Sequence, residues 1–179
     1  KGRYHENMND RDTLETHLNC FESFEPKLPQ SYRDCDVLFL ANIQPSLQMQ
    51  VLDQMNSRPR IVGLDTMNLW IDIAKDDLEK VVAKVDVLII NDQEARQLTG
   101  QDGLQQAART IRAMGPKVLV IKRGEFGALL FGPEDDDLFA APAMLIDDVK
   151  DPTGAGDCFA GGFMGYLAQA GDLSSESLR

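Results

Sequence analysis

The segment Asp151-Pro-Thr-Gly-Ala-Gly-Asp157 combines small residues with two carboxylates in a pattern suited to phosphoryl chemistry. Apolar residues spaced four apart follow it, so we expect a helix with one buried face and with residues 154–156 at its N-terminus. Free backbone N–H groups at a helix N-terminus bind anions, and the helix dipole adds about half a positive charge there. The pattern therefore predicts an anion hole formed by the amides of Gly154, Ala155 and Gly156.

Asp157 places a carboxylate beside this predicted anion hole, which is unfavourable for simple anion binding. In phosphoryl transfer to an alcohol, a positioned Asp accepts the hydroxyl proton while amides and a metal ion stabilise the phosphoryl oxygens. We therefore interpret Asp157 as a general base. The alternative is that Gly154 and Gly156 form a tight loop and that Asp157 only stabilises the first helical turn.

Continuous apolar runs alternate with segments of helical periodicity, which is typical of a parallel sheet covered by helices on both faces. We expect strands at residues 37–41, 61–64, 87–90, 118–121 and 128–131, and helices at residues 45–56, 76–84 and 103–114. Residues 123–127 are predicted to form a hairpin turn, and residues 138–149 one or two antiparallel edge strands. Gly161 and Gly162 are unfavourable inside a helix and are expected to mark close packing of its backbone.

Polar residues stand where the expected strands end. They are Asn42, Asp65, Asn91, Lys122 and Asp151. Ligands of open α/β sheets bind at the carboxyl ends of the strands, so these residues outline a candidate site. Strands also end in polar residues simply because the chain reaches water there, and position alone does not separate the two interpretations.

Residues 151–164 closely resemble the signature of the PfkB carbohydrate kinases, the ribokinase-like family, in which a D-x-x-G-A-G-D element opens a helix. The resemblance implies a three-layer α/β fold and ATP-dependent transfer of a phosphoryl group to a hydroxyl of a sugar or sugar-like acceptor. It implies the same roles for Asp157 and for residues 154–156 as the residue types suggest. It also implies that Asp151 and Thr153 bind a monovalent cation such as K⁺.

Two other functions remain open. Nucleoside kinases share the fold and the D-x-x-G-A-G-D element, so a nucleoside such as adenosine is an alternative acceptor. A catalytically silent module that binds a nucleotide or a sugar is the alternative from a different class, and the carboxylate of Asp157 argues against it. The sequence does not identify the acceptor.

Asn91 and Glu94 resemble the N-x-x-E motif of the family, which implies that they organise Mg²⁺, chiefly through water. Mg²⁺ keeps several waters and needs few protein oxygens, so one carboxylate and one amide would suffice. The same spacing fits a helix capping box, which requires no metal.

Lys122-Arg-Gly-Glu-Phe-Gly127 resembles the nucleotide-side hairpin of the family, K/T-x-G-x-x-G, which implies that Lys122, Gly124 and Gly127 line ATP. An ordinary hairpin turn is the alternative. Asp65 and Asn68 resemble the D-x-N element of the family, which implies that they help to orient phosphates or substrate. A helix cap is the alternative for this pair.

The composition argues against several classes of partner. The 18 Lys and Arg against 29 Asp and Glu give a net charge of −11, so we expect neither nucleic acid nor an acidic membrane surface as a partner. No apolar run approaches the roughly 20 residues that span a bilayer. The three cysteines lack C-x-x-C spacing, which favours a reducing compartment, and we expect a cytoplasmic protein.

The chain is expected to divide into a lid strand segment at residues 1–25 and an incomplete ribokinase-like core at residues 26–179. It begins with Lys1 and lacks a counterpart of the N-terminal acceptor-binding part of the family, so we expect it to be part of a longer chain. Lid strands in the family often pair between subunits, which is compatible with a homodimer. His5 and His17 are expected to be surface or lid residues and not metal ligands.

Overall fold

A six-stranded mixed sheet organises the chain in the computed structural model, which describes residues 2–4, 11–13, 15, 17, 19–134, 137–147 and 149–178. The strands stand in chain order: β3 (Val37–Leu40), β4 (Ile61–Asp65), β5 (Val87–Asn91), β6 (Val118–Lys122), β7 (Ala128–Phe131) and β8 (Leu138–Ala141). Strands β3 to β6 are parallel, and β7 and β8 pair antiparallel at one edge. The predicted mostly parallel sheet with an antiparallel edge is therefore confirmed.

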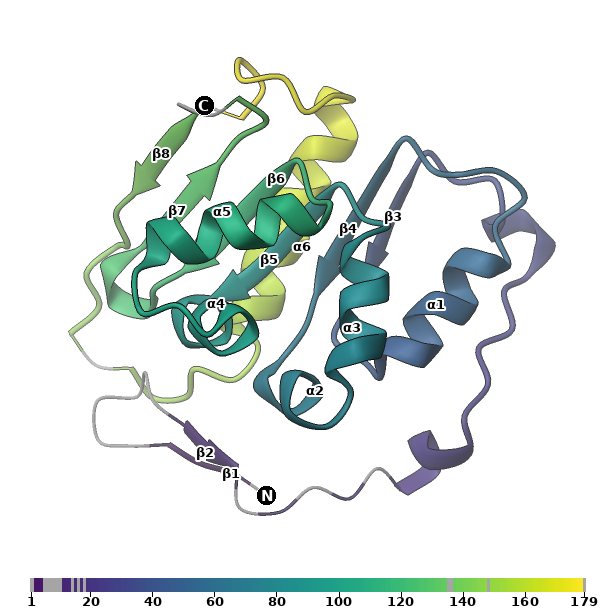
Figure 1. Cartoon of the computed structure of the whole chain (residues 1–179), viewed down its shortest axis with the longest axis horizontal. Helices are drawn as coiled ribbons and strands as arrows, with labels where there is room; N and C mark the ends of the chain where they lie inside the picture. Colours follow the sequence, from purple (N-terminus) through teal and green to yellow (C-terminus); the bar gives the residue numbers. More distant parts are fainter. Residues whose placement is uncertain are drawn as a thin grey trace.

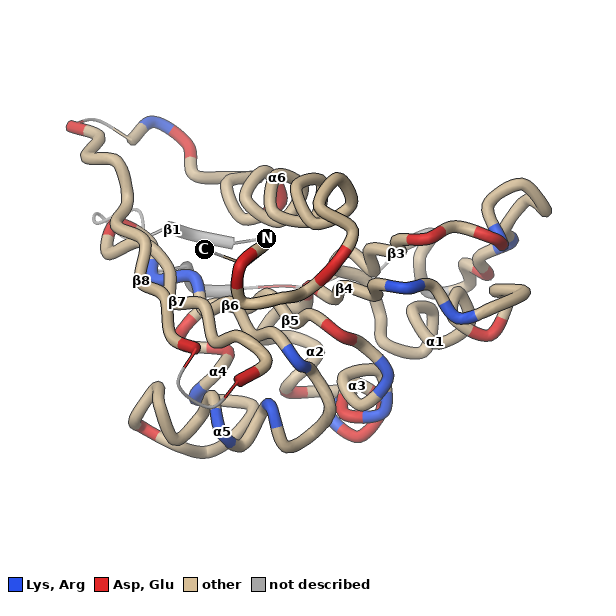
Figure 2. Tube along the Cα trace, turned by 90° about the horizontal axis from the view of Figure 1, so that it is seen from above, with Lys and Arg blue, Asp and Glu red and all other residues tan. Residues whose placement is uncertain are grey.

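Helices cover both faces of this sheet (Figures 1 and 2). One face carries α1 (Pro45–Asp53), α2 (Asn68–Ile73), α3 (Lys75–Val82), α4 (Asp92–Thr99) and α5 (Leu104–Met114), and the other carries α6 (Ala155–Ala170). The 3₁₀ helices are η1 (Asn19–Ser23), η2 (Gln30–Tyr32) and η3 (Gly124–Phe126). None of the helices in the described residues is long and apolar enough to cross a membrane.

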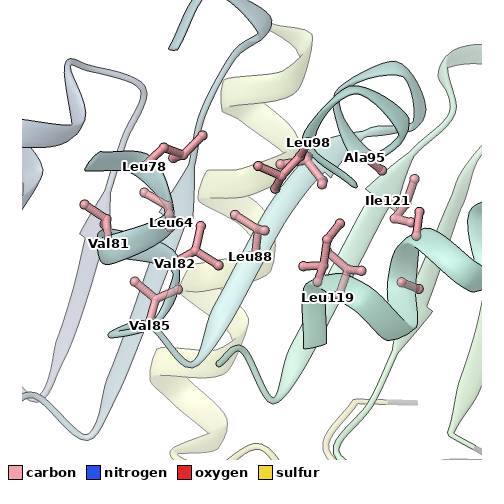
Figure 3. Packing of buried hydrophobic residues seen from close by; sticks show 14 of the residues in the cluster. Leu64, Leu78, Val81, Val82, Val85, Leu88, Ala95, Leu98, Leu119 and Ile121 are labelled. Atoms are coloured by element: carbon pink, nitrogen blue, oxygen red, sulfur yellow. The ribbon is translucent and has the colours of Figure 1, made fainter. Parts of the chain in front are cut away.

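The strands are continuous apolar runs because they are buried from both sides. Leu64, Leu88 and Leu119 face the helices α3 to α5, as Figure 3 shows. Neighbouring residues on the same strands, such as Ile89, pack against α6. Each fully buried aliphatic side chain contributes about 1.5 to 3 kcal/mol, so this double burial makes the central strands a rigid support for the residues at their ends.

Helix α6 lies close to β4 because the strand carries a glycine at the contact. A Cβ atom at Gly63 would lie 2.6 Å from the Sδ and Cε atoms of Met164. Ala160, Met164 and Leu167 of α6 are buried against the sheet. This packing fixes the N-terminus of α6 at the carboxyl edge of the parallel strands (Figure 1).

The expected close packing of the backbone at Gly161 and Gly162 is wrong for the described residues. Both glycines are exposed, and a Cβ atom at either would meet nothing within 4 Å. Helix α6 turns Ala160 and Met164 toward the sheet, so the glycines fall on its outer side.

The expected strands at residues 138–149 are only partly present. Strand β8 ends at Ala141, and residues 142–147 have no regular structure. Asp151 therefore does not end a strand, and it reaches the site through the loop that precedes α6.

A separate antiparallel pair, β1 (Gly2–Tyr4) and β2 (Arg11–Thr13), stands outside the large sheet, and the lid role expected for residues 1–25 stays a prediction. In Figure 1 it lies beyond the carboxyl edge of the parallel strands. His5 lies outside the described residues. The imidazole Nε2 of His17 is 3.9 Å from Glu15 Oε2, and both side chains are exposed.

Candidate active site

Strand register brings the predicted polar residues together at one edge of the sheet. Asn91 at the end of β5 is paired with Lys122 at the end of β6, and Asp65 ends the neighbouring strand β4. The first turn of α6 and the η3 turn lie at the same edge (Figure 1). The edge thus collects the candidate residues of four separate sequence segments.

The Gly-Ala-Gly segment forms the beginning of α6. Gly154 is the N-cap residue, with a left-handed φ of 82°, and Asp157 is an exposed carboxylate in the first turn. The amide of Ala155 donates a hydrogen bond to Pro152 O at 3.1 Å. The Ala155 amide can bind an anion only if this hydrogen bond to Pro152 O breaks. Glycine is favoured at position 154 because the backbone there has a positive φ.

The amine of Lys122 lies against this turn. Its Nζ atom is 3.7 Å from Asp65 Oδ2, and a Cβ atom at Gly156 would lie 3.2 Å from the same Nζ. The Lys122 side chain is 20% exposed and that of Asp65 only 7%. The helix N-terminus therefore has a side-chain cation beside its backbone donors.

Asp65 is a buried carboxyl group. Burial raises its pKa, whereas the Lys122 ammonium and the hydrogen bond from the Thr66 amide, 2.8 Å from Oδ1, oppose that rise. The negative charge of Asp157 also raises the pKa of Asp65. Asp65 is therefore under the electrostatic influence of both Lys122 and Asp157.

Asn91 and Glu94 form the capping box at the start of α4. The Glu94 amide donates to Asn91 Oδ1 at 2.7 Å, and the Asn91 amide donates to Glu94 Oε2 at 2.8 Å. Burial raises the pKa of Glu94 to about 7, although the hydrogen bond from Asn91 and the charge of Lys122 oppose the rise. The capping-box interpretation is confirmed, and it leaves Glu94 Oε1 outside the box.

The oxygen donors at this edge fit Mg²⁺ held largely through water. Asn91 and Glu94 supply an amide and a carboxylate, which suit a hard cation that keeps several waters. The described residues contain no group of three or more His, Cys, Asp or Glu side chains that could hold a metal ion directly. If Asn91 and Glu94 bind Mg²⁺, most of the ligands of the ion are therefore water molecules.

Backbone conformation favours glycine at both glycine positions of the hairpin after β6, and packing also requires it at Gly127. Gly124 and Gly127 both have positive φ, 55° and 82°. A Cβ atom at Gly127 would collide with the carbonyl oxygen of Ala141 at the end of β8. The hairpin-turn interpretation is confirmed, and contact of these glycines with a nucleotide stays a prediction.

Asn68 and Asp151 occupy the margins of the site. Asn68 is the first residue of α2, and the N-cap position belongs to Met67, so the helix-cap alternative for Asn68 is wrong. Asp151 is exposed, and its Oδ1 accepts a hydrogen bond from the Thr153 amide at 2.9 Å. Hydrogen bonds from the Thr153 hydroxyl and amide lower the pKa of Asp151, which keeps it ionised as a cation ligand must be.

Gln48 supports the site and was not expected from the sequence. Its Nε2 donates to the carbonyl oxygens of Ala41 at 2.9 Å and Asp65 at 3.3 Å, so it joins the carboxyl ends of β3 and β4. The side chain is 1% exposed. The available signal is a polar residue beside Leu47 in a helix whose inner face is otherwise apolar.

A cavity lies away from the candidate site, at the other end of the strands. It has a volume of about 590 Å³ and is lined by Arg58, Lys84 and Lys117 at the amino edge of the sheet. Buried Asp86 stabilises this region, because it pairs with Arg58 at 2.9 Å and accepts the Val62 amide at 3.0 Å. None of the residues predicted for the site lines this cavity.

Solved structures show the class to which this fold belongs. The aminoimidazole riboside kinase of Salmonella enterica superposes with a TM-score of 0.63 and 25% identity, over 79% of this chain and 51% of that chain. The ribokinase of Thermotoga maritima gives a TM-score of 0.59 and 26% identity, over 75% and 43% of the two chains. A putative ribokinase II from E. coli, solved in complex with ATP and Mg²⁺, shares the fold at 22% identity and a TM-score of 0.63, over 80% and 49%. The fold is thus ribokinase-like.

The family follows from the sequence match. The profile of the pfkB family carbohydrate kinases matches residues 31–179, and the chain belongs to this family. The cytidine kinase of Thermococcus kodakarensis is 34% identical over 146 residues, which cover 79% of this chain and 51% of that protein. The chain therefore spans about half the length of this relative.

Proposed function

We propose that the protein containing this chain is an ATP-dependent, Mg²⁺-requiring kinase that transfers the γ-phosphoryl group to a hydroxyl of a sugar or sugar-like acceptor. The observation that carries the proposal is the exposed carboxylate of Asp157 in the first helical turn after the positive-φ turn at Gly154. Anion binding alone gives no reason for a carboxylate at this position. Membership of the family and the kinase activity named for its relatives support the proposal.

Asp157 would accept the proton of the acceptor hydroxyl as its oxygen bonds to the γ-phosphorus and the bond to the departing ADP oxygen breaks. The amides of Gly154 and Gly156 would stabilise the negative charge of the transferring group. Ala155 would join them once its hydrogen bond to Pro152 O opens. The dipole of α6 strengthens each of these interactions.

Lys122, Gly124 and Gly127 would line ATP at the hairpin between β6 and β7, and Asp65 and Asn68 would orient phosphates or substrate beside it. The pairing of Lys122 with Asn91 across β6 and β5 supports this placement, because it puts Lys122 beside the residue proposed to hold Mg²⁺.

Asn91 and Glu94 would hold Mg²⁺ through water, and the ion, when bound, would neutralise phosphate oxygens of the nucleotide. Asp151 and Thr153 are proposed for K⁺, since the ionised Asp151 lies in the loop that leads to the anion hole.

A nucleoside or another riboside is the second candidate for the acceptor. The cytidine kinase relative and the aminoimidazole riboside kinase neighbour are both named for ribosides, which favours this acceptor class among sugar derivatives. The silent binding module is less favoured because it has no use for the carboxylate of Asp157.

The β1–β2 pair is proposed as part of a lid, because it lies beyond the edge that carries the site. Pairing of this lid between two subunits is proposed with it, and light scattering of the full-length protein with and without residues 1–25 would test the dimer.

A coupled assay that follows ADP release from Mg-ATP with a panel of sugars and nucleosides tests the function on the full-length protein. Release that depends on one acceptor class is the expected result. Nucleotide binding without release for any sugar or nucleoside would contradict the kinase and favour the binding module.

A further inference from the structure

The amine of Lys122 lies beside the predicted anion hole. Its Nζ lies at the Gly156 position, where an added Cβ atom would approach it to 3.2 Å. Gly127 of the hairpin that follows has another neighbour, because it is packed against Ala141 O. The amine therefore lies toward the start of α6, where the transferring group is proposed to bind.

The carboxylate of Asp65 holds the amine in this place. Asp65 Oδ2 is 3.7 Å from Nζ, and the charge of Lys122 also acts on Glu94. Asp65 is itself fixed, since its Oδ1 accepts the Thr66 amide and its carbonyl oxygen accepts Gln48 Nε2. A lysine has a long, flexible side chain, so a fixed carboxylate at its tip reduces the number of conformations that it can adopt.

We propose that Lys122 binds the γ-phosphoryl group of ATP during transfer, and that Asp65 is a positioning residue that holds its amine beside Gly156. This inference rests on the proposed kinase function and assigns Lys122 to one group of the nucleotide. The phosphoryl group is more highly charged than a single carboxylate, so the amine moves from Asp65 to the phosphoryl oxygens when ATP binds. It keeps its proton throughout, and the hydroxyl proton goes to Asp157.

A contact of Lys122 with the γ-phosphoryl group can be distinguished experimentally from a contact with the ribose or the base. A contact with the γ-phosphoryl group exists for ATP and is absent for ADP. A contact with ribose or adenine is common to both nucleotides. The ratio of the two affinities therefore reports the group that Lys122 touches, and it does so without turnover.

The test measures the Kd of ADP and of a non-hydrolysable ATP analogue by calorimetry, with Mg²⁺, on the full-length protein. Lys122→Met is expected to weaken the analogue about 10- to 100-fold and ADP less than about 3-fold. Lys117→Met is the matched control, because Lys117 precedes the other end of β6 and is 66% exposed at the amino edge. It should leave both affinities unchanged.

Equal weakening of both nucleotides by Lys122→Met, or no weakening, would overturn the assignment. Lys122→Arg keeps the charge and should retain most of the preference for the analogue, which provides the ratio if the Met variant does not fold. If the wild-type protein releases ADP with an acceptor and Lys122→Met has the same nucleotide affinities and turnover, the role of Lys122 is overturned and the proposed kinase function is not. A wild-type protein that binds neither nucleotide would overturn the proposed function as well.

The positioning role of Asp65 has its own readout. Asp65→Asn should lower kcat and the preference for the analogue in the wild-type background, and it should add little to Lys122→Met. An effect of Asp65→Asn that is as large in the Lys122→Met background as in the wild type would show that Asp65 does not act through Lys122.

Discussion

Glu94 is a carboxyl group that the fold buries at the start of α4, where it is 7% exposed and accepts the Asn91 amide. Its pKa rises from 4.5 to about 7 because burial outweighs that hydrogen bond and the charge of Lys122. Between these pH values the folded state retains a proton that the unfolded state has released. The stability that Glu94 contributes is therefore complete below about pH 4.5 and is lost as the pH rises to about 7.

Glu94→Gln should remove this pH dependence, because glutamine keeps an acceptor for the Asn91 amide and carries no charge. Relative to wild type, the variant is expected to gain up to about 3 kcal/mol in unfolding free energy between pH 4.5 and pH 8. Urea unfolding at the two pH values measures the difference. Exposed Glu176→Gln is the control, and an equal gain in both variants would contradict the account of Glu94.

At the scale of the elements, the β6–β7 hairpin depends on a glycine. Gly127 has φ 82° and ψ −142°, and its missing Cβ leaves room for Ala141 O of β8. Gly127→Ala adds both backbone strain and a collision with main chain, so it should cost about 2 to 4 kcal/mol. Chemical denaturation checks this value, and a loss below about 0.5 kcal/mol would show that β8 does not need the close approach.

Helix α6 provides the contrasting case. Gly161 is exposed in the helix interior with no atom within 4 Å of an added Cβ atom. Gly161→Ala should therefore stabilise the protein by about 0.5 to 1 kcal/mol, since alanine restricts the unfolded chain and favours a helix. A loss of stability in the same denaturation experiment would mean that another segment or another chain packs on this side of α6.

At the scale of the whole molecule, the sequence predicted the parallel sheet because its strands are buried on both faces and appear as uninterrupted apolar runs. It did not predict that β8 stops at Ala141, since the apolar residues that continue to Ile146 are exposed and make no ladder. Apolar composition marks a strand only where another surface covers it.

The sequence allowed us to predict where three candidate residues lie, but not which atoms they contact. Asp65, Asn91 and Lys122 were expected at strand ends, and the register brings them to one edge. The position of the Lys122 amine beside Gly156 depends on how closely α6 packs on β4, which no local pattern contains. Gln48 was missed because its role is to bind main-chain oxygens of two strands.

The most direct test of the central claim compares Asp157→Ala with Asp76→Ala in the kinase assay. Both residues are exposed carboxylates in the first turn of a helix, so both substitutions remove the same helix-dipole interaction. The account predicts that Asp157→Ala lowers kcat by about 10² to 10⁴ while ATP affinity is kept, and that Asp76→Ala retains wild-type turnover. Wild-type turnover in Asp157→Ala, or an equal loss in both variants, would contradict the role of Asp157 as the base.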